Sequence, residues 1–266
     1  MLLELIMEIY WGCLLFWLGI SVGSFLNMLL YRTEIKYKLR KKLASKYSEK
    51  RSFCDFCGQQ LSWYENIPVF SWVFLGGKSK CCAKRLPMLY PLLELIMGLL
   101  FVMMGSQFNF DNWFSFGVKL VIISFLVFSA VFDWRHMILP DFSTYILIGC
   151  SLWLWMINGH FEIDYLLAGS GAFIFLLILH LVTKGKGMGM GDVKYVVFMG
   201  LFLGVAKTVL SFYLAFIGGA LIGVTMIIFF KKKKNSRMPF GPFLIGATLI
   251  SWFWGEKLLL FFYSWF

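Results

Sequence analysis

Residues 187–230 read GMGMGDVKYVVFMGLFLGVAKTVLSFYLAFIGGALIGVTMIIFF, and this stretch decides the fold. It opens with a glycine-rich turn and a single carboxylate, Asp192, and continues with about 35 nearly unbroken apolar residues, too long a run for one membrane crossing. A helix needs only about 20 mainly apolar residues to cross the hydrocarbon core of a bilayer. We therefore expect two membrane spans here, 192–205 and 207–230, separated at Gly204 to Lys207.

The composition places the whole chain in the same class. Sixty per cent of its 266 residues are hydrophobic and only 15% are charged. Six further apolar segments occur, at 9–31, 88–106, 114–132, 142–158, 163–182 and 240–263. The sequence predicts an all-α polytopic membrane protein of about eight transmembrane helices. No small-residue cleavage site follows the first segment, so we interpret that segment as a retained anchor.

The basic residues are distributed unevenly between the two sides of the predicted membrane domain. The loops 32–87, 133–141, 183–191 and 231–239, together with Lys194, hold 22 of the 25 Lys and Arg residues, and only Lys119, Lys207 and Lys257 lie elsewhere. Positive residues are enriched in cytoplasmic loops, so these loops are predicted to be cytoplasmic and both termini outside. The net charge of +11 is then explained by topology and by contact with anionic lipid headgroups, as for the run Lys231 to Lys234, and no nucleic acid is implied.

The first of these loops is the one sizeable soluble insertion. Its start, Arg32 to Arg51, is strongly basic and is predicted to form a helix on anionic headgroups. It then carries Cys54 and Cys57 as a Cys-x-x-Cys pair and, later, the adjacent Cys81 and Cys82. Four thiolates in two pairs are the ligands of a structural zinc site, although adjacent cysteines are a poor chelate. Reduced thiols without metal are the alternative. A cytosolic disulfide is less favoured.

Two aspartates stand at the same predicted depth, at the cytoplasmic edge of the membrane. Asp133 ends the span 114–132, and Asp192 begins the span 192–205. An ionisable residue at that depth is a functional candidate by default, because charge is costly there. Peptide hydrolysis by two carboxylates needs one ionised and one protonated, and two close like charges produce that mixed state. The structural alternative is that Asp192 caps the helix after a glycine turn. Asp141 has the same alternative.

The order of several motifs resembles that of the type IV prepilin leader peptidase family, the Gly-x-Gly-Asp membrane aspartyl proteases. The matching blocks run from about residue 20 to about residue 200 in the family's order. They are Gly23 to Asn27, Cys54 to Gly58, Leu61 to Pro68, Tyr90 to Glu94, Asp133 with Leu139 to Asp141, and Gly189-Met190-Gly191-Asp192-Val193-Lys194. The resemblance implies three regions: 1–31 as first transmembrane helix, 32–87 as cytoplasmic basic and cysteine-containing segment, and 88–266 as seven-helix peptidase domain.

The resemblance also implies an activity. Asp133 and Asp192 would be the catalytic residues, with Gly189, Gly191, Lys194 and Asp141 as supporting residues. The enzyme would sit in the bacterial cytoplasmic membrane and remove the short basic leader of type IV prepilins, or of pseudopilins used in protein secretion and competence, by cutting after a glycine. Many family members also methylate the new N-terminus with S-adenosylmethionine, for which this sequence offers no separate motif.

One block departs from the family pattern. The second cysteine pair is usually Cys-x-x-Cys, whereas this chain reads Ser79-Lys80-Cys81-Cys82. Aligned on Tyr90 to Glu94, Cys82 matches the second cysteine and Ser79 replaces the first. If zinc binds, the expected ligands are Cys54, Cys57 and Cys82, with Cys81 as a shifted fourth.

Two other classes of protein stay open at the level of sequence. A secondary transporter also carries intramembrane aspartates and glycine-broken helices. It would require solute flux and leaves the cysteine segment unexplained. A noncatalytic pilus-assembly membrane protein would share the scaffold but tolerate loss of either aspartate.

Overall fold

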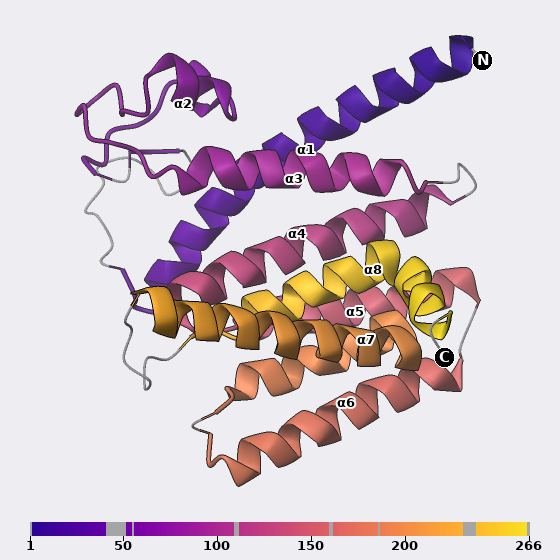
Figure 1. Ribbon diagram of the computed structural model, residues 1–266. Coiled ribbons are helices and arrows are strands. Elements are labelled where there is room, and N and C mark those ends of the chain that lie inside the picture. Colours follow the sequence, from indigo (N-terminus) through magenta and orange to yellow (C-terminus); the bar gives the residue numbers. More distant parts are fainter. Residues whose placement is uncertain are drawn as a thin grey trace. The chain divides into compact units, whose positions relative to one another are not determined.

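The computed structural model describes residues 2–40, 52–54, 56–108, 112–159, 162–185, 187–230 and 238–264. In these residues the regular secondary structure is helical, with two isolated antiparallel bridges and no strand. The elements are α1 (Leu2–Lys36), η1 (Trp63–Asn66), α2 (Phe70–Phe74), α3 (Leu89–Gly105), α4 (Trp113–His136), α5 (Asp141–Asn158), α6 (Ile163–Val182), α7 (Met190–Phe230) and α8 (Gly241–Tyr263) (Figure 1). The predicted all-α fold class is confirmed.

Several of these helices suit a bilayer. Within the described residues, five are long and apolar enough to cross a membrane, and α3 and α5 are shorter apolar helices. One of the five is α7, which contains a residue in a non-helical conformation, Gly204, with φ 75° and ψ 174°. The break falls at the position where the sequence predicted a boundary between two spans. The multi-pass membrane assignment therefore rests on helix length, on composition and on this break.

The chain forms two compact units, Met1–Ser124 and Phe125–Phe266, which are described separately. In the first unit, α1 and α3 are antiparallel and approach closely at small residues. A side chain at Gly19 would contact the backbone of Met97 at 2.6 Å, and one at Gly23 would contact Glu94 at 2.7 Å. Small residues at such crossings let two helix backbones pack directly, which is a main source of helix association in membranes.

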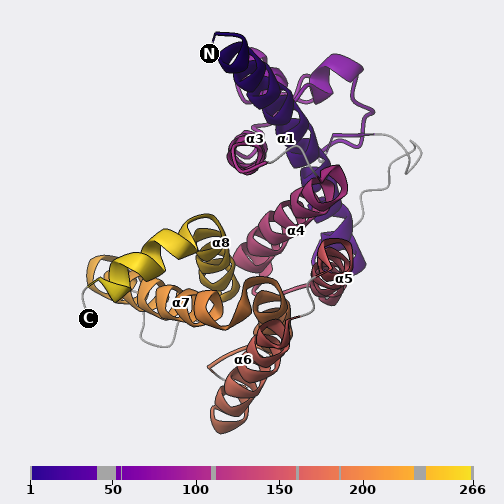
Figure 2. The same cartoon turned by 90° about the vertical axis from the view of Figure 1, so that its right-hand side faces the viewer.

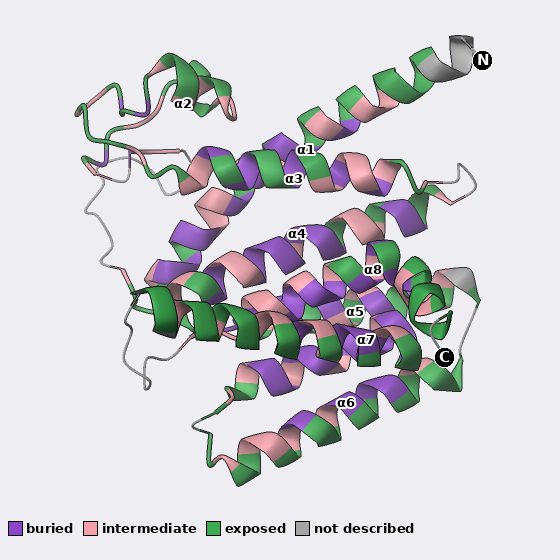
Figure 3. Cartoon of the chain, in the orientation of Figure 1, coloured by how far each residue is buried: buried purple, intermediate pink, exposed green. Residues whose placement is uncertain are grey.

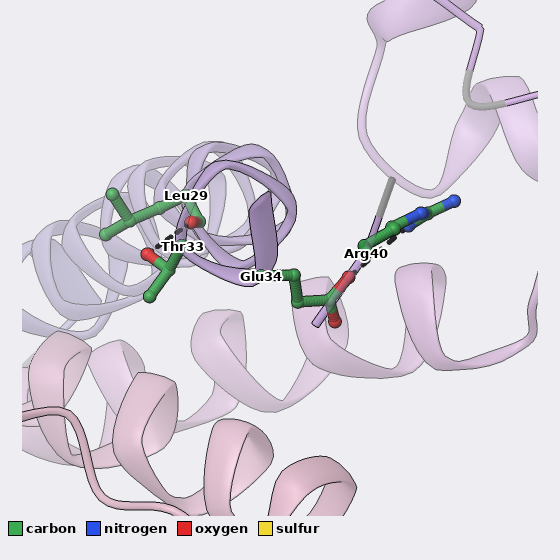
Figure 4. Close-up of polar contacts among 4 residues, drawn as sticks. All are labelled: Leu29, Thr33, Glu34 and Arg40. Carbon is green, nitrogen blue, oxygen red and sulfur yellow. Dashed lines mark hydrogen bonds and ion pairs between the residues drawn. The ribbon is translucent and has the colours of Figure 1, made fainter. Parts of the chain in front are cut away.

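The end of α1 is fixed by local hydrogen bonds (Figure 4). Thr33 Oγ1 donates to the Leu29 carbonyl at 2.8 Å, and Arg40 forms an ion pair with Glu34 at 3.4 Å. Lys38 takes φ 58°, which turns the chain out of the helix. A separate surface helix was predicted from Arg32 to Arg51, but its first residues belong to α1, which continues to Lys36. Residues 41–51 lie outside the described residues. The lysine run 231–234 lies outside them too.

In the second unit, the contacts of α7 with α6 show that the chain doubles back at Gly204. Before the break the two helices are antiparallel, since Gly200 packs on Gly169 and Gly204 lies beside Asp164. After it they run in the same direction, since Phe175 contacts Phe212 and Phe216. Figure 1 shows the two parts of α7 running in opposite directions, and Figure 2 shows α7 between α6 and α8. These two parts correspond to the two predicted spans.

The outer helix α6 shows how this unit meets the membrane. Its buried residues form one stripe of small and aliphatic side chains, Ala168, Gly169, Ala172 and Leu176. Its other faces expose large apolar side chains such as Ile174 and Ile178. Figure 3 shows exposed segments along α6. Exposed apolar faces of this size suit contact with lipid tails rather than water.

Candidate active site

Asp133 lies in the last turn of α4, and its side chain is only 5% exposed. Its Oδ2 has no hydrogen-bond partner within the described part of the chain. The residue beside it is Gly241, the first of α8, where a Cβ atom would lie 2.6 Å from that oxygen. A buried carboxylate oxygen without a partner costs free energy, so its retention indicates a functional role.

Asp192 is the third residue of α7 and is 8% exposed. Its Oδ2 accepts a hydrogen bond from the Gly189 backbone N–H at 3.2 Å. The capping alternative is therefore true in part, since this carboxylate satisfies one free N–H at the helix start while remaining a candidate for chemistry. It does so from the third helical position and not as the N-cap residue.

The glycines before Asp192 matter because they lack a side chain. None of the glycines at 187, 189 and 191 has a positive φ; the left-handed conformation is found earlier, at Gly185 with φ 70°. Gly191 instead packs against Leu139, where an added Cβ would lie 3.0 Å from the Leu139 Cβ. Gly191 therefore serves a close approach of α7 to the segment before α5.

The two aspartates belong to one site. Both lie in the second unit, and their carboxyl groups are close enough for their charges to interact. Because Asp133 ends one helix and Asp192 begins another, the pair is held by the rigid ends of α4 and α7. Rigid elements are the usual way to hold catalytic groups in a fixed geometry.

A second contact braces this arrangement. Lys194 Nζ forms an ion pair with Asp141 Oδ1 at 2.7 Å, which joins the second turn of α7 to the first residue of α5. Asp141 does not cap α5, because the N-cap residue is Pro140 and it makes no side-chain cap. The capping alternative for Asp141 is therefore wrong, and its carboxylate serves the ion pair.

The structure adds residues near the site that the sequence did not single out. Tyr195 is fully buried, and its hydroxyl donates to Thr248 Oγ1 at 3.1 Å, which in turn donates to the Leu244 carbonyl at 2.8 Å. These hydrogen bonds fix the second turn of α7 against α8. Gly241 is the other addition. Its only sequence signal is the Gly-Pro pair that opens α8, a common helix start.

The four cysteines of the first unit form a cluster. The Sγ atoms of Cys54, Cys57, Cys81 and Cys82 all lie within 4.8 Å of one another. The Cys54 to Cys82 distance is 3.8 Å, and the Cys57 to Cys81 distance is 3.1 Å. Tetrahedral zinc with Zn–S bonds of about 2.3 Å requires sulfur atoms about 3.8 Å apart, so the cluster fits a four-thiolate zinc ion after small adjustments.

Two similar turns present these cysteines. In the first, Phe53 bridges Gln60 and the Gly58 N–H donates to the Cys54 carbonyl. In the second, Lys78 bridges Arg85 and the Ala83 N–H donates to the Ser79 carbonyl. The two turns match residue for residue, so that Ser79 occupies the position of Cys54, Cys82 that of Cys57, and Ala83, with φ 54°, that of Gly58, with φ 73°.

Ser79 affects the thiol that it neighbours. Its hydroxyl is 2.9 Å from Cys82 Sγ, and this hydrogen bond is the main cause that lowers the pKa of Cys82 to about 7. Burial, followed by hydrogen bonds with Cys57 and Cys54, raises the pKa of Cys81 to about 12. A bound divalent cation would favour the thiolate form of all four residues.

Comparison with known proteins agrees with both parts of the chain. Residues 17–108 match the bacterial peptidase A24 N-terminal domain, and residues 120–224 match the type IV leader peptidase family. A prepilin leader peptidase/N-methyltransferase of Pseudomonas aeruginosa is 31% identical, with 91% of this chain and 89% of that protein covered. One of Bacillus subtilis is 29% identical, with 94% and 96% covered. No solved structure matches.

The fold and the carboxyl pair define a polytopic membrane protein with the groups of an aspartic-type peptidase. The chain belongs to the type IV leader peptidase family.

Proposed function

We propose that Asp133 and Asp192 are the catalytic pair of a membrane endopeptidase that removes the leader of type IV prepilins or pseudopilins. The observation that carries the proposal is the pair itself: two buried carboxyl groups at the adjoining ends of α4 and α7, with interacting charges and with Asp133 Oδ2 lacking a partner within the described residues. Membership of the leader peptidase family supports the same chemistry.

The pair acts on water and on the scissile carbonyl. An ionised carboxylate takes a proton from the attacking water while its protonated partner donates a hydrogen bond to the carbonyl oxygen. Two close carboxyl groups hold a single proton between them, because ionising both would place two negative charges side by side, which costs free energy. They titrate as one unit, so neither residue is assigned as acid or base. The Gly189 N–H orients the Asp192 carboxylate, and Gly191 together with the Lys194–Asp141 ion pair holds α7 in register.

The substrate follows from the position of the site. A pair at the membrane edge suits a membrane-inserted protein whose hydrophobic helix begins at the cut, and the basic leader of such a protein would lie against anionic headgroups. Cleavage then falls after a glycine that directly precedes this helix. The bacterial cytoplasmic membrane is the location that fits both the helices and the relatives.

The proposed orientation has the site on the cytoplasmic side and both termini outside, from the distribution of the basic residues. Reporter fusions at Gly185 and Gly159, which flank the two ends of α6, test it. A cytoplasmic signal at Gly185 and an external signal at Gly159 are expected. The opposite pattern would place the aspartates on the wrong side.

Zinc is proposed as a structural ion held by Cys54, Cys57, Cys82 and Cys81. Four thiolates leave no open position for water, so the ion would fold the segment that carries the two turns and take no part in catalysis. The relatives are also named as N-methyltransferases, and we propose that this chain methylates the new N-terminal amine with S-adenosylmethionine, which supplies the methyl group.

A cleavage assay tests the function. Purified protein in detergent is mixed with a full-length prepilin, and the products are identified by mass spectrometry. The expected result is one cut, directly after a glycine before the hydrophobic helix. An intact prepilin, with a purified protein that is folded, would support the noncatalytic or transporter alternatives instead.

A further inference from the structure

His180 lies in the last turn of α6, the helix that precedes the glycine-rich segment before Asp192. Its side chain is half-buried, and its Nδ1 lies 2.8 Å from the Met188 carbonyl oxygen. A carbonyl oxygen only accepts hydrogen bonds, so Nδ1 carries the proton and donates it to this oxygen. The bond therefore joins the end of α6 to the segment that leads into α7.

The partner of His180 is also the partner of Asp192, through a single peptide group. The Met188 carbonyl and the Gly189 N–H belong to one planar unit, which we call the bridging peptide. Its oxygen accepts from His180 at 2.8 Å, and its N–H donates to Asp192 Oδ2 at 3.2 Å. Because a planar peptide moves as one body, a shift of the carbonyl also displaces the N–H that faces the carboxylate.

The turn at the end of α6 fixes the ring of His180. The Gly185 N–H donates to the His180 carbonyl at 2.9 Å, and Gly185 has φ 70°. A Cβ atom at Gly185 would lie 3.3 Å from His180 Cε1, so this glycine packs directly against the ring. The next contact is similar, since a Cβ at Gly187 would lie 3.0 Å from Thr183 Cγ2. Local packing therefore holds the imidazole in one orientation.

The two hydrogen bonds of the bridging peptide support each other. Donation to the carbonyl polarises the amide, which makes its N–H a better donor. The group that receives this N–H is a carboxyl group, and hydrogen bonds to an ionised carboxylate are roughly twice as strong as those between neutral groups. At 3.2 Å the bond to Asp192 is at the long end of the usual range, so it depends on how well the N–H is aimed.

We propose that His180 is a positioning residue of the peptidase, which holds the bridging peptide so that its N–H orients the Asp192 carboxyl group. The inference rests on the catalytic pair proposed above. It extends that pair, which α4 and α7 carry, to a side chain from α6. His180 acts on Asp192 through the bridging peptide and takes no part in the chemistry.

Three substitutions of His180 test this role by leader cleavage. His180→Asn keeps an amide N–H at the position of Nδ1, whereas His180→Leu fills the space without a donor. We expect His180→Leu to lower kcat by about tenfold with KM unchanged, the scale for weakening one hydrogen bond to a charged group. His180→Asn should stay within about threefold of the wild type, because it restores that bond. His180→Gln carries its amide at the position of Nε2 instead, so it should resemble His180→Leu and replaces it if the leucine variant does not fold.

A spectroscopic measurement reads the two bonds without cleavage. Methionine labelled with carbon-13 at the carbonyl and glycine labelled with nitrogen-15 select the Met–Gly peptides in the NMR spectrum of the protein in detergent. The signal of the bridging peptide is assigned by its loss in Met188→Leu. Its carbonyl carbon reports the bond from His180, and its amide proton reports the bond to Asp192. Both shifts should move in His180→Leu, and both should stay near the wild-type values in His180→Asn.

The matched control is Thr183→Val, at the same end of α6. It keeps the size of the side chain and removes a hydroxyl that bonds to the Leu179 carbonyl of its own helix at 2.8 Å. It should leave kcat and the signal of the bridging peptide unchanged. An equal loss of kcat in Thr183→Val and His180→Leu would show a general effect of the helix end and would overturn the inference. A carbonyl shift that moves in His180→Leu while the amide proton stays would also overturn it, because the two bonds would then be independent.

The two measurements separate this inference from the peptidase proposal. An inactive wild-type protein contradicts the peptidase proposal, and the NMR shifts still test whether His180 orients the bridging peptide. Cleavage by the wild type with an unchanged kcat in His180→Leu contradicts the role of His180 alone.

Discussion

At the scale of single residues, the site depends on how a buried carboxyl group is accommodated. Asp133 and Asp192 have little solvent contact, and Asp133 Oδ2 has no hydrogen-bond partner among the described residues. Such groups lower stability and are retained where chemistry needs them, which is why perturbed carboxyl groups concentrate at active sites. The surroundings of the pair should therefore be more sensitive to change than equivalent positions elsewhere on the same helices.

The Gly241→Ala variant tests the close approach of α8 to Asp133. The three atoms nearest to the added Cβ would all belong to Asp133, the closest at 2.6 Å, so the carboxyl group has to move. Misplacing a reacting group by about 1 Å costs on the order of 100-fold, and kcat for leader cleavage should fall by about that factor. The control is Gly246→Ala in the same helix, where nothing lies within 4 Å. Equal activity of the two variants would contradict the proposed geometry.

The ion pair between Asp141 and Lys194 should have a smaller effect. Both side chains are well exposed, at 54% and 35%, and an exposed ion pair contributes about 0–1 kcal/mol. Asp141→Asn should therefore lower kcat/KM by less than about fivefold, a factor set by that energy. Glu256→Gln, which removes the distant Lys207 pair, is the matched control and should be neutral. An inactive Asp141→Asn protein would move Asp141 into the catalytic group.

The sequence could predict the aspartates but not the residues that hold them. Asp133 and Asp192 stand out because charge is rare in apolar segments and because flanking motifs repeat a family order. Gly241 follows Asp133 by more than a hundred positions and carries no titratable group. Its role depends on a tertiary contact that no local pattern encodes.

At the scale of elements, the decisive feature is the break in α7. Its position was predictable, since 41 continuous helical residues would extend about 60 Å, roughly twice the hydrocarbon thickness. The backbone conformation and the contacts that form the break were not predictable. Gly204 adopts φ 75°, and the Asp164 carboxylate accepts from the Val205 N–H at 3.0 Å, which caps the second half from another helix. The short elements η1 and α2 were also not predicted, because four- and five-residue helices carry no usable periodicity.

The Gly204→Ala variant should destabilise this break. With φ 75° and ψ 174°, Gly204 lies in a region that is essentially restricted to glycine and costs other residues about 1–3 kcal/mol, and the added Cβ would lie 2.6 Å from Asp164 Oδ2. The melting temperature in detergent should therefore fall clearly. Gly218→Ala, later in α7 and with no atom within 4 Å, should leave it unchanged or raise it slightly. Equal melting temperatures would show that the break does not depend on Gly204.

The cysteine turns allow a rescue experiment. Elemental analysis of wild-type protein purified without chelators should find one zinc per chain, and Cys81→Ser should lose it. Ser79→Cys combined with Cys81→Ser should regain it, because residue 79 occupies the position equivalent to Cys54 and its side chain already contacts Cys82. Cys13→Ser, in α1, is the control. Substoichiometric zinc that Cys54→Ser does not change would show that the thiols bind no metal.

At the scale of the whole molecule, composition and charge determined the class and the number of helices. The eight predicted spans correspond to α1, α3, α4, α5, α6, the two parts of α7 and α8, because apolar length is set by the bilayer. The largest difference is at α1, which runs Leu2–Lys36 where the span 9–31 was predicted. The grouping into two compact units, with α3 in the first, was not accessible. This grouping depends on contacts between helices, such as those of α1 with α3. Apolar runs in the sequence of a membrane protein do not specify which helices make such contacts. The division at residues 31 and 87 remains a prediction.

The most direct test of the central claim is leader cleavage by Asp133→Asn and Asp192→Asn, each purified in detergent and assayed on a full-length prepilin. Asparagine keeps the size of the side chain but removes the shared proton of the pair. The account predicts that each variant matches the wild-type melting profile and shows no detectable cleavage. Cleavage retained by either well-folded variant would contradict the assignment of these two residues as the catalytic pair.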